Sequence, residues 1–567
     1  MTAAWPRAAG FAGVSGTCKT TACPPPRLAL GGAFTAPMPT QPRRRSTASR
    51  AVKSADGAVA EQNGADADSL RQLADVTSAV DAALGTILSE SAEGAQAPVT
   101  VPTSELRAKV EVAIERLSTG LLERETEVRL LLLSALCGEH LLLLGPPGTA
   151  KSELSRRLNR LVGGEYFERL LTRFSVPEEL FGPLSMRGLE NDEYVRQTAG
   201  YLPTAQVAFI DEIFKANSAI LNALLTLLNE RLFDNGNQRL EAPLMTLVGA
   251  SNELPESEEL DALYDRFLIR RTVAQVSNAQ LSKLARLAAG RSDGPTAAST
   301  ADGTSSFAEE KGSAHHISVD EFQSTPSKAY AAVDVPDAVI DVIVAVRNYL
   351  QDKCEPPIYV SDRRFMKSIQ MLQVAAYGDG RDEVIEADCL LLEHVFGNRP
   401  DDCHKVKAYV IETIASDPGL QQAEMVFLGL FGRALRLLGS NSNASQAELQ
   451  EAVVEAGSLA GLLRSRHGSL VRTLEAGFPE LQGSVWLSES AVAAAVQGLS
   501  PQMTENRRKV EELLREALVL QSCLERGAAA GGAAGGSNGQ LMERMLPKRL
   551  KQYQKGIANA SAAAPSG

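Results

Sequence analysis

The sequence predicts an α/β fold with a five-stranded parallel sheet flanked by helices, followed by an all-α domain and a helical C-terminal region. Two observations carry this prediction. An apolar run, Leu141–Leu144, passes through a Gly-rich turn into a helix that opens at Ser152. After that helix, short apolar runs alternate with segments of helical periodicity, which is the pattern of a parallel sheet with helical crossovers.

The Gly-rich turn is a candidate phosphate-binding loop, made of Gly145, Pro146, Pro147, Gly148, Thr149, Ala150, Lys151 and Ser152. Backbone N–H groups in such a loop converge on an anion, Lys151 is placed to reach the outer phosphates of a nucleotide, and the Ser152 hydroxyl to hold Mg²⁺. The usual pattern has Gly before the Lys, where this chain has Ala150. A Cβ there is harmless if the backbone keeps a negative φ, so nucleotide binding is expected.

A second apolar strand, Val207–Ile210, delivers Asp211 and Glu212 at its carboxyl end. Taken alone, two acids after a strand are more often a surface cap. Their place about 60 residues after a phosphate-binding loop favours a catalytic pair. We expect Asp211 to bind Mg²⁺ through water and Glu212 to polarise the attacking water.

The remaining strands are expected at Phe167–Leu171, Met245–Ala250 and Phe267–Val273, with a short hairpin strand at Tyr194–Ala199. The strand Met245–Ala250 runs into Asn252, which could position the attacking water. Because carboxyl ends of parallel strands share one edge of a sheet, the phosphate-binding loop, the two acids and Asn252 should meet there. An Asn-Gly turn at Asn235 predicts a β-hairpin after a helix at Asn217–Arg231.

The first 55 residues hold eight basic residues, no acid, and much Ala, Ser, Thr and Pro. This composition is typical of an organelle transit peptide. We expect delivery to the chloroplast stroma, with the mitochondrial matrix as the alternative. Removal of this segment takes the net charge from −12 to −20, which disfavours nucleic acid as a partner. No apolar run reaches the length of a transmembrane segment.

Composition and periodicity divide the whole chain into seven parts. They are a transit peptide (1–55), an acidic, Ala-rich linker (56–103), the α/β domain (104–275), a helix with a flexible low-complexity insertion (276–334), a small helical domain (335–418), a helical C-terminal region (419–526), and a Gly/Ala linker with a basic tail (527–567). The Gly/Ala linker is placed at Gly527–Gly539, and the last helix of the C-terminal region at Met503–Arg526. The basic tail is expected to be a solvated surface and not a binding site.

Several ordered blocks resemble the AAA+ ATPases of the MoxR family, and specifically its RavA-type branch. The blocks are GPPGTAKS (145–152), TRFSVPEELFGPLS (172–185), GYLPTA (200–205), FIDEIFKANSAILNALLTLLNER (209–231), ASNELPE (250–256), ALYDRFLIR (262–270) and YVSDRR (359–364). The resemblance covers about residues 104 to 400. It fades after about residue 420, where the RavA-type β-rich module has no counterpart in these helical patterns.

This resemblance implies a P-loop AAA+ domain with an all-α lid, ATP and Mg²⁺ as ligands, and a homo-hexameric ring. Asn252 would be the sensor after the fourth strand, and Arg363 the sensor arginine of the lid, with Arg364 as its alternative. Arg266 would be the arginine finger that completes the neighbouring subunit's site. Arg270, Arg271 and Arg364 are the alternates for that role, and an ion pair with Asp265 is the simpler reading of Arg266. Residues 176–202 match the family's insertion, which projects into the ring.

The function expected from the resemblance is ATP-driven remodelling or activation of an unknown client protein, as related members do in metal-cofactor insertion. One alternative is the motor subunit of a magnesium-chelatase-like complex, which would need a partner with an integrin-type metal-binding domain. Another is a scaffold that binds ATP with negligible turnover. The joint presence of Lys151, Asp211, Glu212, Asn252 and the two arginines disfavours the scaffold.

Overall fold

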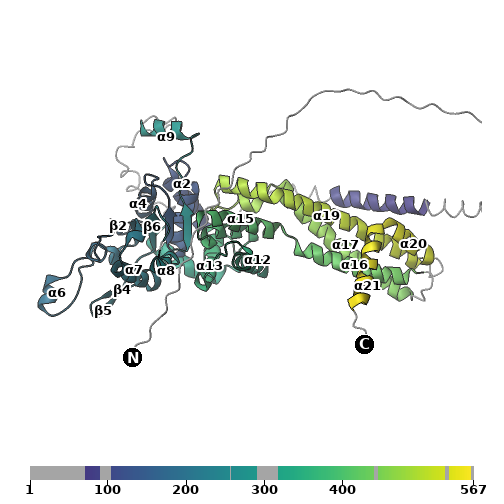
Figure 1. Ribbon diagram of the computed structural model, residues 1–567. Coiled ribbons are helices and arrows are strands. Elements are labelled where there is room, and N and C mark those ends of the chain that lie inside the picture. The colour runs from purple at the N-terminus through teal and green to yellow at the C-terminus, as the bar shows by residue number, and fades with distance from the viewer. Residues whose placement is uncertain are drawn as a thin grey trace, which may run out of the picture. The chain divides into compact units, whose positions relative to one another are not determined.

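The structure is a computed structural model, and it describes residues 71–89, 104–255, 257–289, 317–439, 445–529 and 535–563. The predicted transit peptide lies outside the described residues. Figure 1 shows the arrangement of the elements, among which a five-stranded parallel sheet carries the α/β domain. The strands are β1 (Leu141–Leu144), β2 (Tyr166–Leu170), β3 (Val207–Asp211), β6 (Thr246–Ser251) and β7 (Ile269–Thr272).

The strand order across the sheet is β2-β3-β6-β1-β7, and every neighbouring pair is parallel. The predicted fold class is therefore confirmed. β1 is an interior strand, paired with β6 through Leu141–Val248 and with β7 through Leu141–Ile269. The carboxyl ends of β1, β3 and β6 consequently lie side by side at one edge.

Burial explains why the strands read as unbroken apolar runs. All four leucines of β1 are buried, and they alternate between two hydrophobic clusters on opposite faces of the sheet. Helices cover both faces. They are α2 (Glu105–Ser118), α3 (Glu125–Cys137), α4 (Lys151–Val162), α7 (Ser218–Glu230) and α8 (Glu258–Tyr264). After β7 comes α9 (Leu281–Ala288), none of whose residues is buried.

The segment between β2 and β3 leaves the sheet as a long excursion, which contains α5 (Glu178–Phe181), α6 (Met186–Glu190) and η1 (Leu202–Thr204). The strand expected at Tyr194–Ala199 is wrong, since these residues form a single antiparallel bridge, Leu184 to Arg196. The predicted hairpin is present as β4 (Leu232–Asn235) and β5 (Gln238–Glu241). The Asn235 side chain bonds the backbone N and O of Arg196 at 2.6 and 3.1 Å, and so joins hairpin and excursion.

The second part of the chain is all-helical. Its elements are α11 (Val319–Ala332), α12 (Asp337–Asn348), η3 (Tyr349–Lys353), α13 (Asp362–Gly378), η4 (Glu386–Leu392), α14 (Glu393–Phe396) and α15 (Pro400–Ala415). Residues 319–332 were expected within the flexible insertion, and here the expectation is wrong. Ser318 and Glu321 form a capping box, and Phe322 and Ala329 are buried against the core.

The C-terminal helices have their own hydrophobic cluster. They are α16 (Pro418–Leu437), α17 (Gln446–Glu475), α18 (Pro479–Gln482), α19 (Glu489–Ala529), α20 (Gly535–Met545) and α21 (Pro547–Ala563). The helix at residues 71–89 packs into the same cluster through Val76, Val80 and Ile87. Its Asp81 pairs with Arg515 at 2.7 Å.

Three expectations for this region need correction. The last helix starts at Glu489 and not at Met503, because α19 continues through Pro501. Part of the predicted Gly/Ala linker is helical, since α20 begins at Gly535. The basic tail is not simply solvated: Arg549 reaches Glu516 at 2.7 Å and lies over the ring of Phe427. Among the described residues, no helix is long and apolar enough to cross a membrane.

Candidate nucleotide-binding site

The phosphate-binding loop joins the carboxyl end of β1 to the first turn of α4. Gly145 has φ 155°, and a Cβ there would lie 2.3 Å from the carbonyl oxygen of Val273. Gly148 has φ 77°. Ala150 has φ 67°, so the expectation of a negative φ is wrong. A left-handed alanine costs about 1–2 kcal/mol, and this strained residue sits at the entrance of the helix.

Lys151 opens α4 and lies beneath the loop, with its side chain largely buried. Its ammonium donates to the carbonyl oxygens of Gly145 at 2.6 Å and Pro146 at 3.0 Å. Burial lowers the pKa of Lys151, while the charges of Asp211 and Glu212 oppose that shift. The predicted lysine and the two predicted acids therefore lie close enough to act on each other.

Asp211 and Glu212 stand at the end of β3, and both are half-buried. Glu212 adopts φ 54°, and its backbone N–H donates to Asp211 Oδ1 at 3.0 Å. Asn252 follows β6 and donates from Nδ2 to Glu212 Oε1 at 2.9 Å. Lys215 lies 3.4 Å from the other Glu212 oxygen. Strands that neighbour each other in the sheet thus bring the acid and the amide together.

Two residues that the sequence analysis missed support the loop from behind. Arg124 is 5% exposed, and its guanidinium donates to the carbonyl oxygens of Thr149 at 3.1 Å and Ala274 at 2.8 Å. Glu123 has φ 55° and accepts bonds from the backbone N–H and hydroxyl of Ser277. These contacts tie α3 to the loop and to the end of β7. In the sequence these two residues are charged and lie between two helical patterns, and nothing there predicts that Arg124 is buried.

The predicted arginine finger, Arg266, and the predicted sensor arginine of the lid, Arg363, lie elsewhere, at the amino edge of the sheet. Arg266 precedes β7, and Arg363 lies in the first turn of α13. The helix α13 is anchored beside Glu139, two residues before β1, by a 2.7 Å ion pair between Glu139 and Lys367. The phosphate-binding loop is at the opposite end of the same strand. A single chain therefore does not bring Arg266 or Arg363 to its own loop.

The alternates for the arginine finger are all engaged inside the chain. Arg270 is 3% exposed, bonds the carbonyl oxygens of Phe267 and Tyr264, and has its pKa lowered to about 9, chiefly by burial. Arg271 pairs with the buried Glu127 at 3.0 Å. Arg364 pairs with Asp265 at 2.9 Å. Arg266 reaches Asp265 only at 3.6 Å, so the expected simple ion pair exists but is long.

The donor set at the carboxyl edge fits a Mg²⁺-bound nucleotide. A loop of backbone N–H groups and a buried ammonium suit phosphate oxygens. The Ser152 hydroxyl and the Asp211 carboxylate supply the oxygen ligands that Mg²⁺ prefers. The fold and this edge together define a P-loop nucleoside-triphosphate-binding protein.

Comparisons with known proteins agree with this class. A family model described as the MoxR domain in MoxR-vWA-beta-propeller ternary systems matches residues 108–308, and an AAA lid domain model matches residues 338–410. An uncharacterised protein of Methanocaldococcus jannaschii is 42% identical over 301 residues, which cover 53% of this chain and 73% of the relative. A second protein of that organism is 41% identical over 300 residues, which cover 53% and 74%.

The chaperone MoxR1 of Mycobacterium tuberculosis is 28% identical over 172 residues, which cover 30% of this chain and 45% of MoxR1. The chain belongs to the MoxR family of AAA+ ATPases. The helices at 335–418 can accordingly be called its lid.

Proposed function

We propose that this protein hydrolyses ATP with Mg²⁺ in a hexameric ring of the RavA type, and that the ring remodels or activates a client protein. The observation that carries the proposal is the contact between Asn252 and Glu212 beside Lys151. An acid, an amide and a buried ammonium at one sheet edge are the groups that phosphoryl transfer to water requires. The similarity to a chaperone of the same family supports the proposed action on a client protein.

Each residue has a distinct role in this proposal. Loop N–H groups and Lys151 would bind the phosphates, and Ser152 and Asp211 would hold Mg²⁺, which would supply neutralising charge at the phosphate oxygens. Glu212 accepts a proton from water, and its hydrogen bond to Asn252 fixes the carboxylate that does so. Lys151 leaves the carbonyl oxygens of Gly145 and Pro146 when a phosphate offers a stronger, charged acceptor.

The positions of Arg266 and Arg363 are evidence for a ring. Both arginines lie at the amino edge, away from the chain's own loop, and a neighbouring subunit's phosphates are the target left for them. An arginine supplied across an interface raises phosphoryl-transfer rates by about 10³–10⁵-fold. Hydrolysis would then require assembly, and the excursion at residues 176–202 with the β4–β5 hairpin would present apolar side chains such as Met186 and Tyr194 to a client.

The test is steady-state ATP hydrolysis by the full chain as a function of its concentration. Specific activity should rise with concentration as a hexamer-sized species forms. Glu212→Gln should bind ATP without turnover, and Lys151→Ala should not bind it. Mixtures of Arg266→Ala with Lys151→Ala should regain activity, because mixed interfaces join an intact finger to an intact loop. Flat, negligible turnover with tight ATP binding would favour the scaffold instead.

A second candidate is a motor that works only with a dedicated partner, as in a magnesium-chelatase-like complex. The matched family model is described for ternary systems of MoxR, vWA and beta-propeller proteins, and a vWA domain is the integrin-type partner that this alternative needs. ATP turnover that appears only after addition of a vWA-domain protein would favour this candidate.

The composition of residues 1–55 supports import into the chloroplast stroma. A fluorescent fusion of these residues should enter plastids, and entry into mitochondria would favour the alternative compartment.

A further inference from the structure

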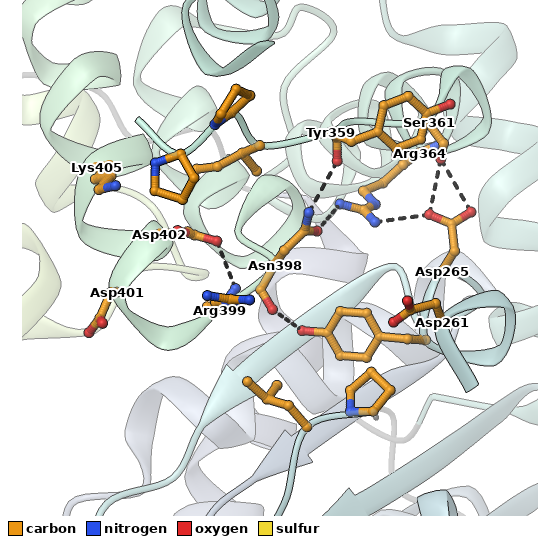
Figure 2. A pocket seen from close by; sticks show the side chains of 16 residues that line it. Asp261, Asp265, Tyr359, Ser361, Arg364, Asn398, Arg399, Asp401, Asp402 and Lys405 are labelled. Carbon is orange, nitrogen blue, oxygen red and sulfur yellow. Dashed lines mark hydrogen bonds and ion pairs between the residues drawn. The ribbon is translucent and has the colours of Figure 1, made fainter. Parts of the chain in front are cut away.

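A polar cluster joins the α/β domain to the lid at the amino edge of the sheet, and it forms one wall of a pocket of about 980 Å³ (Figure 2). Asp265 follows α8, while Ser361 and Arg364 belong to the start of α13. Arg364 donates from Nη2 to Asp265 Oδ1 at 2.9 Å. The Ser361 hydroxyl lies 3.1 and 3.2 Å from the two Asp265 oxygens. The carboxylate of the α/β domain is therefore bound to the first turn of the lid helix.

Arg364 is held from a second side as well. Its Nη1 donates to Asn398 Oδ1 at 2.8 Å, and the same oxygen accepts a bond of 3.0 Å from Arg270. The Asn398 amide in turn donates to the carbonyl oxygen of Tyr359 at 3.2 Å. The Arg364 side chain is only 4% exposed. Of these bonds, the one between Arg270 and Asn398 crosses from the α/β domain to the lid, so a shift of the lid against the α/β domain would break it.

Each member of the Asp265–Arg364 pair is adjacent in sequence to one of the proposed trans-acting arginines. Arg266 directly follows Asp265, and Arg363 directly precedes Arg364. Burial lowers the pKa of Arg363, and the positive charge of Arg266 lowers it further. Because Asp265 and Arg364 are in contact at 2.9 Å, Arg266 and Arg363 flank one ion pair. The charges of Glu139 and Asp265 oppose the repulsion between the two arginines in part.

Both arginines also carry an N–H donor that makes no hydrogen bond to any described residue. Among the described residues, Arg266 Nε and Arg363 Nη1 are buried and have no hydrogen-bond partner. Buried N–H groups are normally bonded. Arg231, Arg347 and Arg364 also carry one N–H each that is unbonded in the described part of the chain. The two orphans therefore support a missing acceptor only together with the position of both arginines beside the Asp265–Arg364 pair. A phosphate oxygen would serve as that acceptor and would offset the repulsion.

We propose that the Asp265–Arg364 ion pair is the positioning element that aligns the lid with the α/β domain, so that Arg266 and Arg363 meet one phosphate group together. This inference rests on the proposed function, because the phosphate belongs to the neighbouring subunit's nucleotide. Asp265 and Arg364 do not touch that nucleotide and act through the two arginines. A misplacement of about 1 Å at a reacting group can cost about 10²-fold in rate.

The test begins with Asp265→Asn in the full chain, which keeps the side-chain shape but removes the charge. We expect kcat to fall about 10- to 100-fold with KM for ATP changed less than threefold, because the variant's own phosphate-binding loop is intact. Asp362→Asn is the matched control: it makes the same change next to Arg363, but Asp362 pairs with Arg347 inside the lid. We expect near-parental kcat for this control. Equal kcat values for the two variants would overturn the inference.

Three further experiments distinguish a positioning role of Asp265 from a general loss of structure. If Asp265 acts through Arg266, the double variant Asp265→Asn/Arg266→Ala is no slower than Arg266→Ala, whereas additive losses contradict the inference. Lys151→Ala subunits should restore activity to Asp265→Asn in mixtures, and no rescue at any ratio counts against it. Parental turnover by Arg266→Ala would refute the trans role and this inference with it. Loss in Arg266→Ala with full activity in Asp265→Asn refutes the inference alone.

Discussion

The side-chain amide of Asn252 and the carboxylate of Glu212 are joined by a hydrogen bond of 2.9 Å between the ends of β6 and β3. The bond leaves the second Glu212 oxygen facing Lys215 at 3.4 Å. The carboxylate is thus oriented by a neutral donor on one side and a half-exposed cation on the other.

These two partners of Glu212 should differ in importance. Asn252→Ala should lower kcat by about 10²–10³-fold, the usual loss for one oriented hydrogen-bond donor at a reacting centre, with ATP affinity unchanged within threefold. Lys215→Ala is the control, because a half-exposed ion pair is worth little. Single-turnover hydrolysis and ATP titration of both variants measure the difference. Equal rates for the two variants would show that the amide does not orient the base.

The strain at Ala150 predicts a stabilising substitution. Ala150→Gly removes a left-handed cost of about 1–2 kcal/mol and adds unfolded-state freedom of about 0.5–1 kcal/mol. The net gain in free energy of unfolding should be up to about 1.5 kcal/mol. Ala223→Gly, inside α7 with ordinary helical geometry, should instead lose about 1 kcal/mol. Urea unfolding of the two variants compares them, and a matching loss at both sites would exclude strain at Ala150.

Arg124 should matter for nucleotide affinity although it lies behind the loop. Arg124→Gln removes the bonds to Thr149 and Ala274, and we expect the Kd for ATP to rise about tenfold, or about 1.4 kcal/mol. Arg129→Gln makes the same change further along α3, where the guanidinium bonds the carbonyl oxygen of Val485. Calorimetric ATP titration should show little change for Arg129→Gln. A Kd for Arg124→Gln equal to the parental value would remove this support role.

His140 makes stability depend on pH. Its Nδ1 accepts from the Leu247 backbone N–H, its Nε2 lies 3.3 Å from the Leu228 carbonyl oxygen, and burial holds its pKa well below the usual value. The native imidazole stays neutral while the unfolded one binds a proton below about pH 6.5. Stability therefore falls as pH drops below that value, by up to about 1.4 kcal/mol per pH unit.

His140→Gln should flatten part of this dependence. Urea unfolding at pH 5.0 and 7.5 measures the difference in free energy for both proteins. A parental pH dependence that persists unchanged in the variant would assign it to other groups, such as the buried His394, whose pKa is also lowered by burial.

The sheet and its carboxyl edge were predictable because each strand is short, apolar and followed by a polar group with a known partner. The run of four leucines in β1 and the Asp211–Glu212 pair at the end of β3 are local signals. The positive φ of Ala150 was not predictable, because the identity of the residue as alanine does not indicate its backbone conformation. The burial of Arg124 depends on carbonyl groups up to 150 residues away in the chain.

In the C-terminal region, too, the sequence could not predict features that depend on distant parts of the chain. Pro501 predicts a helix boundary, yet α19 continues through it. The glycines at the start of α20 predict a linker, but Gly539 packs against the backbone of Leu438. The weak helical pattern at residues 71–89 gives no hint of its partner, because that partner is formed by helices near the other end of the chain.

That pairing has a consequence for how the protein is made. Asp81 and Arg515 are 434 positions apart in the chain. At a synthesis rate of about 5–20 residues per second, the helix at 71–89 emerges about 20–90 s before α19 exists. The helices against which Val76, Val80 and Ile87 pack are therefore still missing while the α/β domain and the lid are being synthesised. The C-terminal cluster can close only after α19 has been synthesised, so this cluster is completed later than the α/β domain and the lid.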